Sequence, residues 1–439
     1  MNTIEMAASV AGAVLLLFFL WRNREAFPYL LVAVLGLEYF GGATDGGSFT
    51  VPKLGFAALA LAQFIFGRVR LRLFPRAVIP VLLLYVGYFA ASTLWSVAPE
   101  RAIVRSVTLV ALLAAFVAAA GAIESTKDVH RFLRALVLYG AASAITAFVQ
   151  MSQGTMLLDE DMGGRVGGLG VNPTEGAFYL SIALLITVAY HIDPRNAEGW
   201  LSTASVRIIL ISVLSVGLLM TGSRGGISAF LVASSVLVLV KRRSLVVDRT
   251  KILKRVTVVG LVAGMMVLVM TIPRQMLLER VASAKSDELG NRFVIWEKVG
   301  EQVHQNPMFG SGLNSAMIAN SNHQDTVTYS THNALLTAML DGGIVGLLLL
   351  LWICWRVFKA VVMLLRSPMP MMESLGLQLS AMVLCAALIM MSHDLGFNKI
   401  LWMMLGVVEA TMALNMFSLR KAPRLAQQTL RVLPRHAKA

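Results

Sequence analysis

The chain has 439 residues, of which 57% are hydrophobic and 14% charged, and its mean hydropathy is +0.72. Soluble globular proteins carry about a quarter charged residues, so this composition excludes a soluble protein. The formal net charge of +14 would suggest nucleic-acid binding in a soluble chain. In a membrane protein, however, basic residues gather in cytoplasmic loops, and their positions decide the interpretation.

Apolar runs of the length that crosses a membrane recur along almost the whole chain. Thirteen candidate spans are found, at 5–21, 26–41, 51–67, 77–95, 102–122, 132–150, 176–191, 206–220, 225–240, 255–272, 343–363, 376–393 and 399–418. The run at 26–41 is the weakest candidate, because it is short and contains Pro28 and Glu38. If the first three runs include a re-entrant segment that does not cross the membrane, the number of spans is twelve. We predict an all-α, polytopic integral membrane protein with 12–13 transmembrane helices in a single membrane-embedded domain, residues 1–439.

Three basic clusters predict the orientation of these spans. They lie at 68–76, at 241–255 and in the tail at 420–439, and they account for the whole positive excess. The positive-inside rule places them in the cytoplasm, so 151–175, 221–225, 273–331 and 394–398 are expected together on the opposite side. The charge therefore indicates topology, and no nucleic-acid partner is predicted.

The segment 273–331 is the one long loop between spans, and its basic and acidic residues nearly balance. Helical spacing predicts an amphipathic helix from Asn291 to about Gln305, on the apolar positions Phe293, Trp296, Val299 and Val303. A weaker pattern predicts a second one at 274–288. The motif NPMFGSGLNS then breaks the helix, and HNALLTAML from His332 predicts an apolar helix that ends at Asp341-Gly-Gly.

The motif T-G-S-R-G-G at 221–226 forms a tight turn between two apolar runs. Arg224 places a fixed positive charge at the membrane boundary, and its small neighbours, Ser223 and Gly225 among them, leave backbone N–H groups accessible. A snorkelling arginine in an ordinary hairpin is one interpretation. An anion site is the one we favour, because an arginine at this depth is unfavourable unless it is paired or hydrated.

Arg292 and His332 are the next candidates in the external loop. Arg292 follows Gly290-Asn291 at the start of the predicted helix and could hold an anion, although an exposed pair with Glu297 is favoured from these residues alone. His332, followed by Asn333, stands where the loop re-enters the membrane, and histidine accepts protons near neutral pH. A lone interfacial histidine is more often structural, and position alone leaves this open.

The glycine-rich segment 163–174 carries Arg165 and Asn172 but lacks the lysine pattern of a nucleotide-binding loop. It is either a loop that closes over a lipid-linked substrate or simply a flexible loop. The triplet Asp159-Glu160-Asp161 is interpreted as solvated, because three consecutive carboxylates cannot all face one ion from regular structure. His393-Asp394 and Lys399, at the final outward turn, either orient a substrate or cap helices.

Over roughly residues 160–350 the chain resembles the O-antigen ligase and polymerase superfamily. The resemblance lies in the order and spacing of its motifs: T-G-S-R-G-G, N-R-F-V-I-W-E-K, N-P-M-F-G-S-G-L-N, and T-H-N-A-L-L with D-G-G-I-V-G. Within that superfamily the chain looks most like the ligases. The resemblance therefore implies a membrane glycosyltransferase of lipopolysaccharide biosynthesis with about twelve spans. The resemblance implies that His332 is the essential histidine and that Arg224, Arg292 and Arg165 hold the donor pyrophosphate. Asn333, Asn172, Ser223 and Gly225 are possible supporting residues, and the family's proline-asparagine pair is Pro173-Thr174 here.

The resemblance also implies an enzyme of the bacterial inner membrane whose active site faces the periplasm. It transfers O-antigen polysaccharide from undecaprenyl pyrophosphate to the lipid A–core oligosaccharide, and membrane lipids surround it. We further hypothesise that the transfer inverts the configuration, with His332 removing the acceptor proton, and that it needs no metal or cofactor, because arginines suit the charge of the departing pyrophosphate. The alternatives are an O-antigen polymerase, a protein O-oligosaccharyltransferase of the same superfamily and, in a different class, a lipid or polysaccharide transporter. The sequence does not indicate the oligomeric state.

Overall fold

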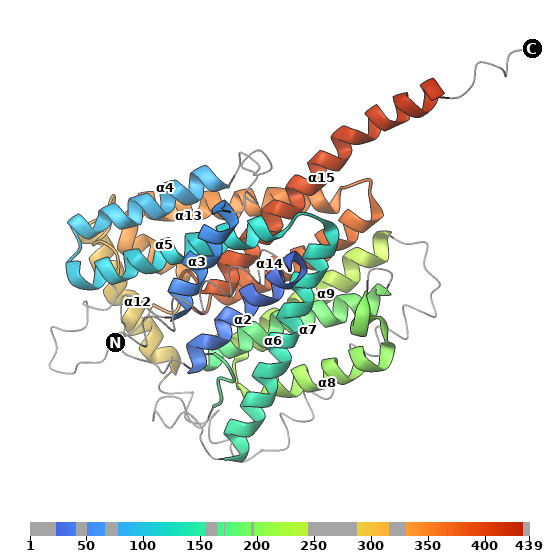
Figure 1. Ribbon diagram of the computed structural model, residues 1–439. Helices are drawn as coiled ribbons and strands as arrows, with labels where there is room; N and C mark the ends of the chain where they lie inside the picture. Colours follow the sequence, from blue (N-terminus) through green and yellow to red (C-terminus); the bar gives the residue numbers. More distant parts are fainter. Residues whose placement is uncertain are drawn as a thin grey trace, which may run out of the picture.

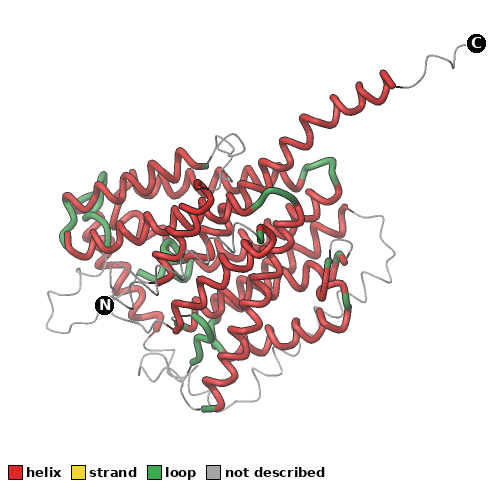
Figure 2. Tube along the Cα trace, in the orientation of Figure 1, coloured by secondary structure: helices red, strands yellow, loops and turns green. Residues whose placement is uncertain are grey.

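The structure is a computed structural model that describes residues 23–40, 51–65, 78–153, 165–170, 172–194, 197–244, 288–315 and 331–432. In these residues every regular element is a helix (Figures 1 and 2). The helices are α2 (Phe27–Phe40), α3 (Val51–Ile65), α4 (Ile79–Ala91), α5 (Pro99–Ala122), α6 (Thr126–Ser152), α7 (Pro173–Ile192), α8 (Ala204–Met220), α9 (Arg224–Ser244), α12 (Glu288–Gln305), α13 (Ala334–Leu365), α14 (Pro370–Met390) and α15 (Lys399–Val432). Short 3₁₀ turns are η1 (Arg24–Ala26), η2 (Ser92–Leu94) and η5 (Gly199–Ser202). The predicted all-α class is confirmed.

Six of these helices are long and apolar enough to cross a membrane: α5, α6, α7, α13, α14 and the part of α15 up to Arg420. Shorter apolar helices lie in α2, α3, α4, α8 and α9. The chain is therefore a multi-pass membrane protein. The predicted runs at 5–21 and 255–272, and the predicted helix at 274–288, fall largely or wholly outside the described residues. The total of 12–13 spans thus remains a prediction.

Helix α7 lies at the centre of the bundle and packs against α6, α8, α9 and α14 (Figure 1). Almost every residue from Gly176 to Tyr190 is buried, as expected of a helix that is apolar all round. Close contact between α6 and α7 requires a small residue, because a methyl group added at Gly140 would lie 2.3 Å from the Ala183 Cβ atom. Small residues at such crossings let membrane helices approach closely.

Helix α13 differs from the prediction at both ends of its first segment. It begins at Ala334 rather than at His332, and it continues through the predicted stop to Leu365. The stop survives as a kink, because Gly343 has a non-helical backbone with φ 59° and ψ −159°. A Cβ atom at Gly343 would lie 2.4 Å from the carbonyl oxygen of Met308, so the segment after α12 crosses α13 at this kink.

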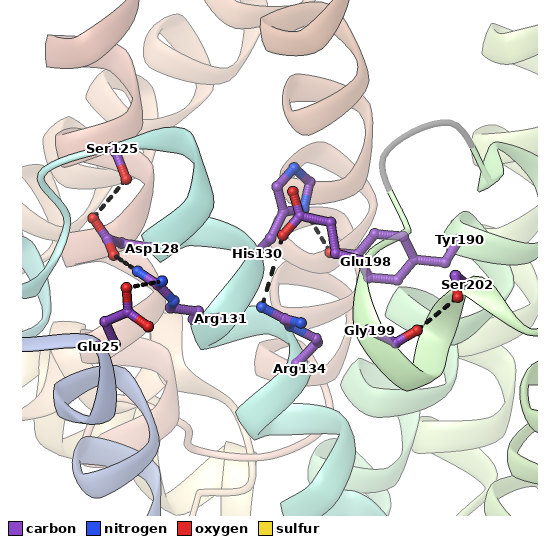
Figure 3. A network of polar contacts seen from close by, with 10 residues as sticks. All are labelled: Glu25, Ser125, Asp128, His130, Arg131, Arg134, Tyr190, Glu198, Gly199 and Ser202. Carbon is purple, nitrogen blue, oxygen red and sulfur yellow. Dashed lines mark hydrogen bonds and ion pairs between the residues drawn. The ribbon is translucent and has the colours of Figure 1, made fainter.

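One end of the bundle is held together by paired polar side chains (Figure 3). This end contains the start of α6, the end of α7, η5 and the residues just before α2. We call these contacts the paired network; they are Arg131–Glu25 at 2.7 Å, Arg131–Asp128 at 2.7 Å, Ser125–Asp128 at 2.8 Å, His130–Tyr190 at 2.7 Å and Arg134–Glu198 at 3.9 Å. The candidate site is at the opposite end, where α6 and α8 finish and α7, α9, α13 and α15 begin.

Candidate functional site

The described part of the glycine-rich segment, 165–170, is docked on the end of α6. The Gly168 N–H donates to Gln150 Oε1 at 3.0 Å, and Gln150 Nε2 donates back to the Gly168 carbonyl at 3.1 Å. The left-handed φ of 59° at Gly168 and its contact with Ser143 leave no room for a side chain. These contacts hold residues 165–170 against α6, and closure of the loop over a substrate stays a prediction.

Arg165 joins this loop to the turn between α8 and α9. Its Nε atom donates a hydrogen bond to the Thr221 carbonyl at 3.1 Å, and the side chain is half-buried. Two segments that are more than fifty residues apart are thereby placed side by side, as an anion site shared between Arg165 and Arg224 requires. Asn172 has a different role, because its side chain accepts from the Glu175 N–H at 2.9 Å and caps α7.

The turn at 221–226 presents Arg224 as the first residue of α9. Ser223 is buried and its hydroxyl accepts from the Gly226 N–H at 3.3 Å, which caps the helix. The Arg224 side chain is exposed. A helix N-terminus carries a partial positive charge, so Arg224 adds a full charge to a position that already favours anions.

His332 stands immediately before α13, in a left-handed backbone conformation with φ 50°. Asn333 follows as the cap of α13, because its Oδ1 atom accepts from the N–H groups of Leu335 at 2.9 Å and Leu336 at 3.2 Å. The Asn333 Nδ2 atom also donates to the Met391 carbonyl at 3.2 Å. The cap thus fixes His332 beside the loop between α14 and α15.

Helix α12 is anchored to the same place. The Trp296 indole N–H donates to the carbonyl of Thr331, the residue before His332, at 3.1 Å. Arg292 lies one turn before Trp296 in this helix, and its side chain is outside the described part of the structure. The helix starts at Glu288, earlier than predicted, so the N–H of Arg292 is past the first turn and is not available to an anion.

The loop 391–398 connects the arginine turn with His332. A Cβ atom at Gly225 would lie 2.6 Å from the Ser392 hydroxyl oxygen, so the start of α9 abuts this loop. The next residue, His393, has its ring centre 6.0 Å from that of His332. Arg224 and His332 therefore flank the same short loop, although more than a hundred residues separate them in the sequence.

Residues 208–351 match the family model described as O-antigen ligase. This part of the chain is similar to the O-antigen ligase superfamily. A search of curated proteins with the chain found no match. The matched segment begins in α8 and ends in α13, so it contains Arg224, Arg292 and His332, whereas Arg165 and the loop 391–398 lie outside it.

Asp394 is the main residue of this candidate site whose importance the sequence left open. Burial raises the pKa of its carboxyl group above the ordinary value. The Gly396 N–H, the Arg105 guanidinium, the Thr337 hydroxyl and the His332 ring act in the opposite direction, because each stabilises the ionised form. The only sequence signal for Asp394 was its position at an outward-facing turn. Its proximity to His332 could not be predicted, because it depends on contact between segments that are distant in the chain.

A small cavity lies between α4, α5, α13 and the loop 391–398. Thr337, Asp341 and Asp394 line its polar side, and its volume of about 20 Å³ is enough for a water molecule but not for a sugar. Asp341 accepts from the N–H groups of Asn314 and Ser315, each at 3.0 Å. The NPMFGSGLNS motif is thus tied to α13, which gives that family motif a structural role.

Within the described residues, no group of three or more histidine, cysteine, aspartate and glutamate side chains is arranged to hold a metal ion. The predicted site residues have two kinds of position in the structure: some lie near the loops at one end of the bundle, and others cap or pack the helices there. Arg165, Arg224 and His332 meet around the loops at one end of the bundle, and Arg292 is in the helix anchored beside them. The predicted supporting residues Asn172, Ser223 and Asn333 cap the helices that carry this site, and Gly225 provides the close contact.

Proposed function

We propose that this protein is a membrane glycosyltransferase that moves O-antigen polysaccharide from undecaprenyl pyrophosphate to the lipid A–core oligosaccharide at the periplasmic face of the inner membrane. One observation carries the proposal: Gly225, beside Arg224, contacts Ser392, and His393, the next residue, lies 6.0 Å from His332. That arrangement, with Arg224 and His332 next to one loop, supports a site in which cationic groups and a candidate base act on the same substrate. The family match supports the donor class.

The cationic groups suit the leaving group of this reaction. The glycosyl–pyrophosphate bond is already activated, so the main requirement is to stabilise negative charge on the departing pyrophosphate. Arg224 is exposed at a helix N-terminus, and Arg165 is held against the same turn. Their planar guanidinium groups can each bind two phosphate oxygens, and we assign them, with Arg292, to the donor pyrophosphate.

His332 is the proposed general base. Its imidazole takes the proton from an acceptor sugar hydroxyl, the hydroxyl oxygen bonds to the anomeric carbon, and the bond from that carbon to the pyrophosphate breaks on the opposite side, which inverts the configuration. Undecaprenyl pyrophosphate leaves. Asp394, which interacts electrostatically with His332, stabilises the imidazolium ion formed in this step.

The test is a transfer assay with the purified full chain in liposomes, given undecaprenyl pyrophosphate-linked glycan and, in parallel, lipid A–core, free repeat unit or a protein acceptor. We expect product only with lipid A–core. Product with the repeat unit would instead indicate a polymerase, and product with the protein an oligosaccharyltransferase. Since Asp159-Glu160-Asp161 has the spacing of a metal-binding D-x-D motif, EDTA is added in one arm, and full activity is expected to remain.

A further inference from the structure

A groove of about 410 Å³ runs between α13 and α15 at the end of the bundle away from His332. Its lining includes Trp355, Phe358, Lys359, Arg366, Asn415 and Leu419. After the kink at Gly343, Arg366 lies on the order of 35 Å along α13, at about 1.5 Å per residue. This length is comparable with the hydrocarbon thickness of a bilayer, about 30 Å, so we place the groove near the membrane surface opposite the candidate site.

One wall of the groove is aromatic and exposed. Trp355 is 59% exposed and Phe358 is 58% exposed, and their stacked ring centres are 5.9 Å apart. Exposed aromatic rings at the end of a membrane helix are typical of the interface between acyl chains and headgroups. This wall therefore suits acyl chains rather than a soluble ligand.

The same face of α13 carries two exposed cations. Lys359 and Arg366 are seven residues apart, which places them two turns apart on one side of the helix. None of the described residues that line the groove is acidic. The Ser367 hydroxyl donates to Asn415 Oδ1 at 2.7 Å and thereby joins the segment after α13 to α15 within the lining of the groove.

Helix α15 extends the positive field. Figure 1 shows its last part running away from the rest of the bundle, and the sequence after Glu409 contains basic residues but no acid. Basic clusters next to a transmembrane helix attract anionic lipids at the cytoplasmic surface. The groove thus combines an apolar wall, two fixed cations and a basic surrounding.

We propose that this groove binds an anionic phospholipid, with its phosphate between Lys359 and Arg366 and its acyl chains against Trp355 and Phe358. A free phosphate ion would use the cations but would leave the aromatic wall uncovered. A zwitterionic phospholipid would cover the wall but would not neutralise both cations. The anionic phospholipid satisfies both parts of the groove, and its binding is independent of the proposed transferase activity.

Fluorescence quenching by brominated lipids tests this proposal. The full chain is reconstituted in phosphatidylcholine bilayers that contain a fixed fraction of either brominated phosphatidylglycerol or brominated phosphatidylcholine. The difference between the wild type and Trp355→Phe isolates the Trp355 signal. We expect brominated phosphatidylglycerol to quench it several-fold more strongly, and each of Lys359→Gln and Arg366→Gln to reduce this preference about five-fold, the effect of one cation near a membrane surface.

Lys127→Gln is the matched control, because Lys127 is an exposed lysine at the start of α6, at the same end of the bundle. It should leave the preference unchanged. Equal quenching by the two brominated lipids would overturn the proposal, and so would a preference that survives loss of both Lys359 and Arg366. Loss of the preference on addition of millimolar inorganic phosphate at constant ionic strength would assign the site to the phosphate ion instead.

Discussion

At the end of the bundle where α6 begins, Arg131 lies 2.7 Å from both Glu25 and Asp128, whereas at the end where α9 begins, Arg224 is an exposed first residue of a helix. Both are arginines near the start of a helix, but Arg131 follows an aspartate by three residues whereas Arg224 lies in a turn of small residues. The first is used to hold elements together, because its charge is matched within the protein. The second forms no ion pair among the described residues, which is the property expected of a ligand site.

Histidines show the same contrast. His130 is 3% exposed and its Nδ1 atom is 2.7 Å from the Tyr190 hydroxyl oxygen, so its ring is enclosed in a defined contact. His332 is half-exposed, stands in a left-handed backbone conformation and lies beside His393 and Asp394. Changes at the paired network should therefore affect stability, and changes at the candidate site should affect transfer.

The largest effect in this comparison is expected for Arg224→Lys. Lysine keeps the charge but loses the two-pronged geometry, and loss of such a charge-assisted contact costs about 1.5–3 kcal/mol, or roughly 10- to 100-fold in transfer rate. Arg101→Lys is the control, because Arg101 is exposed near the start of α5. Steady-state transfer by both variants gives the answer, and full activity of Arg224→Lys would argue against pyrophosphate binding.

Asp394→Asn should slow transfer about tenfold, on the order of 1.4 kcal/mol, because the imidazolium formed at His332 loses a stabilising carboxylate. Without that carboxylate His332 loses its proton at lower pH. The acidic limb of the pH–rate profile should therefore move to lower pH, and a shift to higher pH, or none, would be inconsistent with the assigned contact.

Gly225→Ala should reduce transfer several-fold, because the new methyl group lies 2.6 Å from the Ser392 hydroxyl oxygen and pushes α9 from the loop 391–398. Overpacking of this kind costs about 1–3 kcal/mol. The double variant Gly225→Ala/Ser392→Ala should recover much of the loss. Gly87→Ala, where nothing lies within 4 Å, is the control. Additive losses in the double variant would show that the two sites do not touch.

The smallest effect on transfer is expected for Tyr190→Phe in the paired network. Removal of the hydroxyl leaves the buried His130 ring without this partner, at a cost of about 1–3 kcal/mol in stability. The melting temperature of the purified protein should fall, while the rate of transfer per folded molecule should stay at the wild-type value. A specific loss of transfer would show that the two ends are coupled.

The sequence predicted the helices better than the contacts between them. Apolar runs located α5, α6, α7 and α14 to within a few residues at most ends, because burial in lipid demands continuous apolar segments. The sequence located the irregularity at Asp341-Gly-Gly but predicted a helix end there, whereas the structure has a kink. The kink at Gly343 depends on the close passage of Met308. A local pattern contains no information about such a neighbour.

The candidate site divides in the same way. Arg224 stood out because an arginine is costly at a membrane boundary, and His332 because histidine accepts protons near neutral pH; the family resemblance gave both of them roles. The start of α12 was misplaced by three residues, which changed the interpretation of the Arg292 backbone. The sequence left the role of His393-Asp394 open and did not predict the contacts of Ser392, His393 and Asp394, because these contacts join three segments that are distant in the chain.

The central claim is that the arginines bind the donor and His332 performs the proton transfer. Measuring the affinity of the purified wild type, Arg224→Ala and His332→Ala for undecaprenyl pyrophosphate-linked glycan, alongside transfer by the same preparations, tests this division directly. His332→Ala should bind the donor as tightly as the wild type and transfer none, whereas Arg224→Ala should bind at least tenfold more weakly. Wild-type donor affinity in Arg224→Ala, or retained transfer in His332→Ala, would contradict the account.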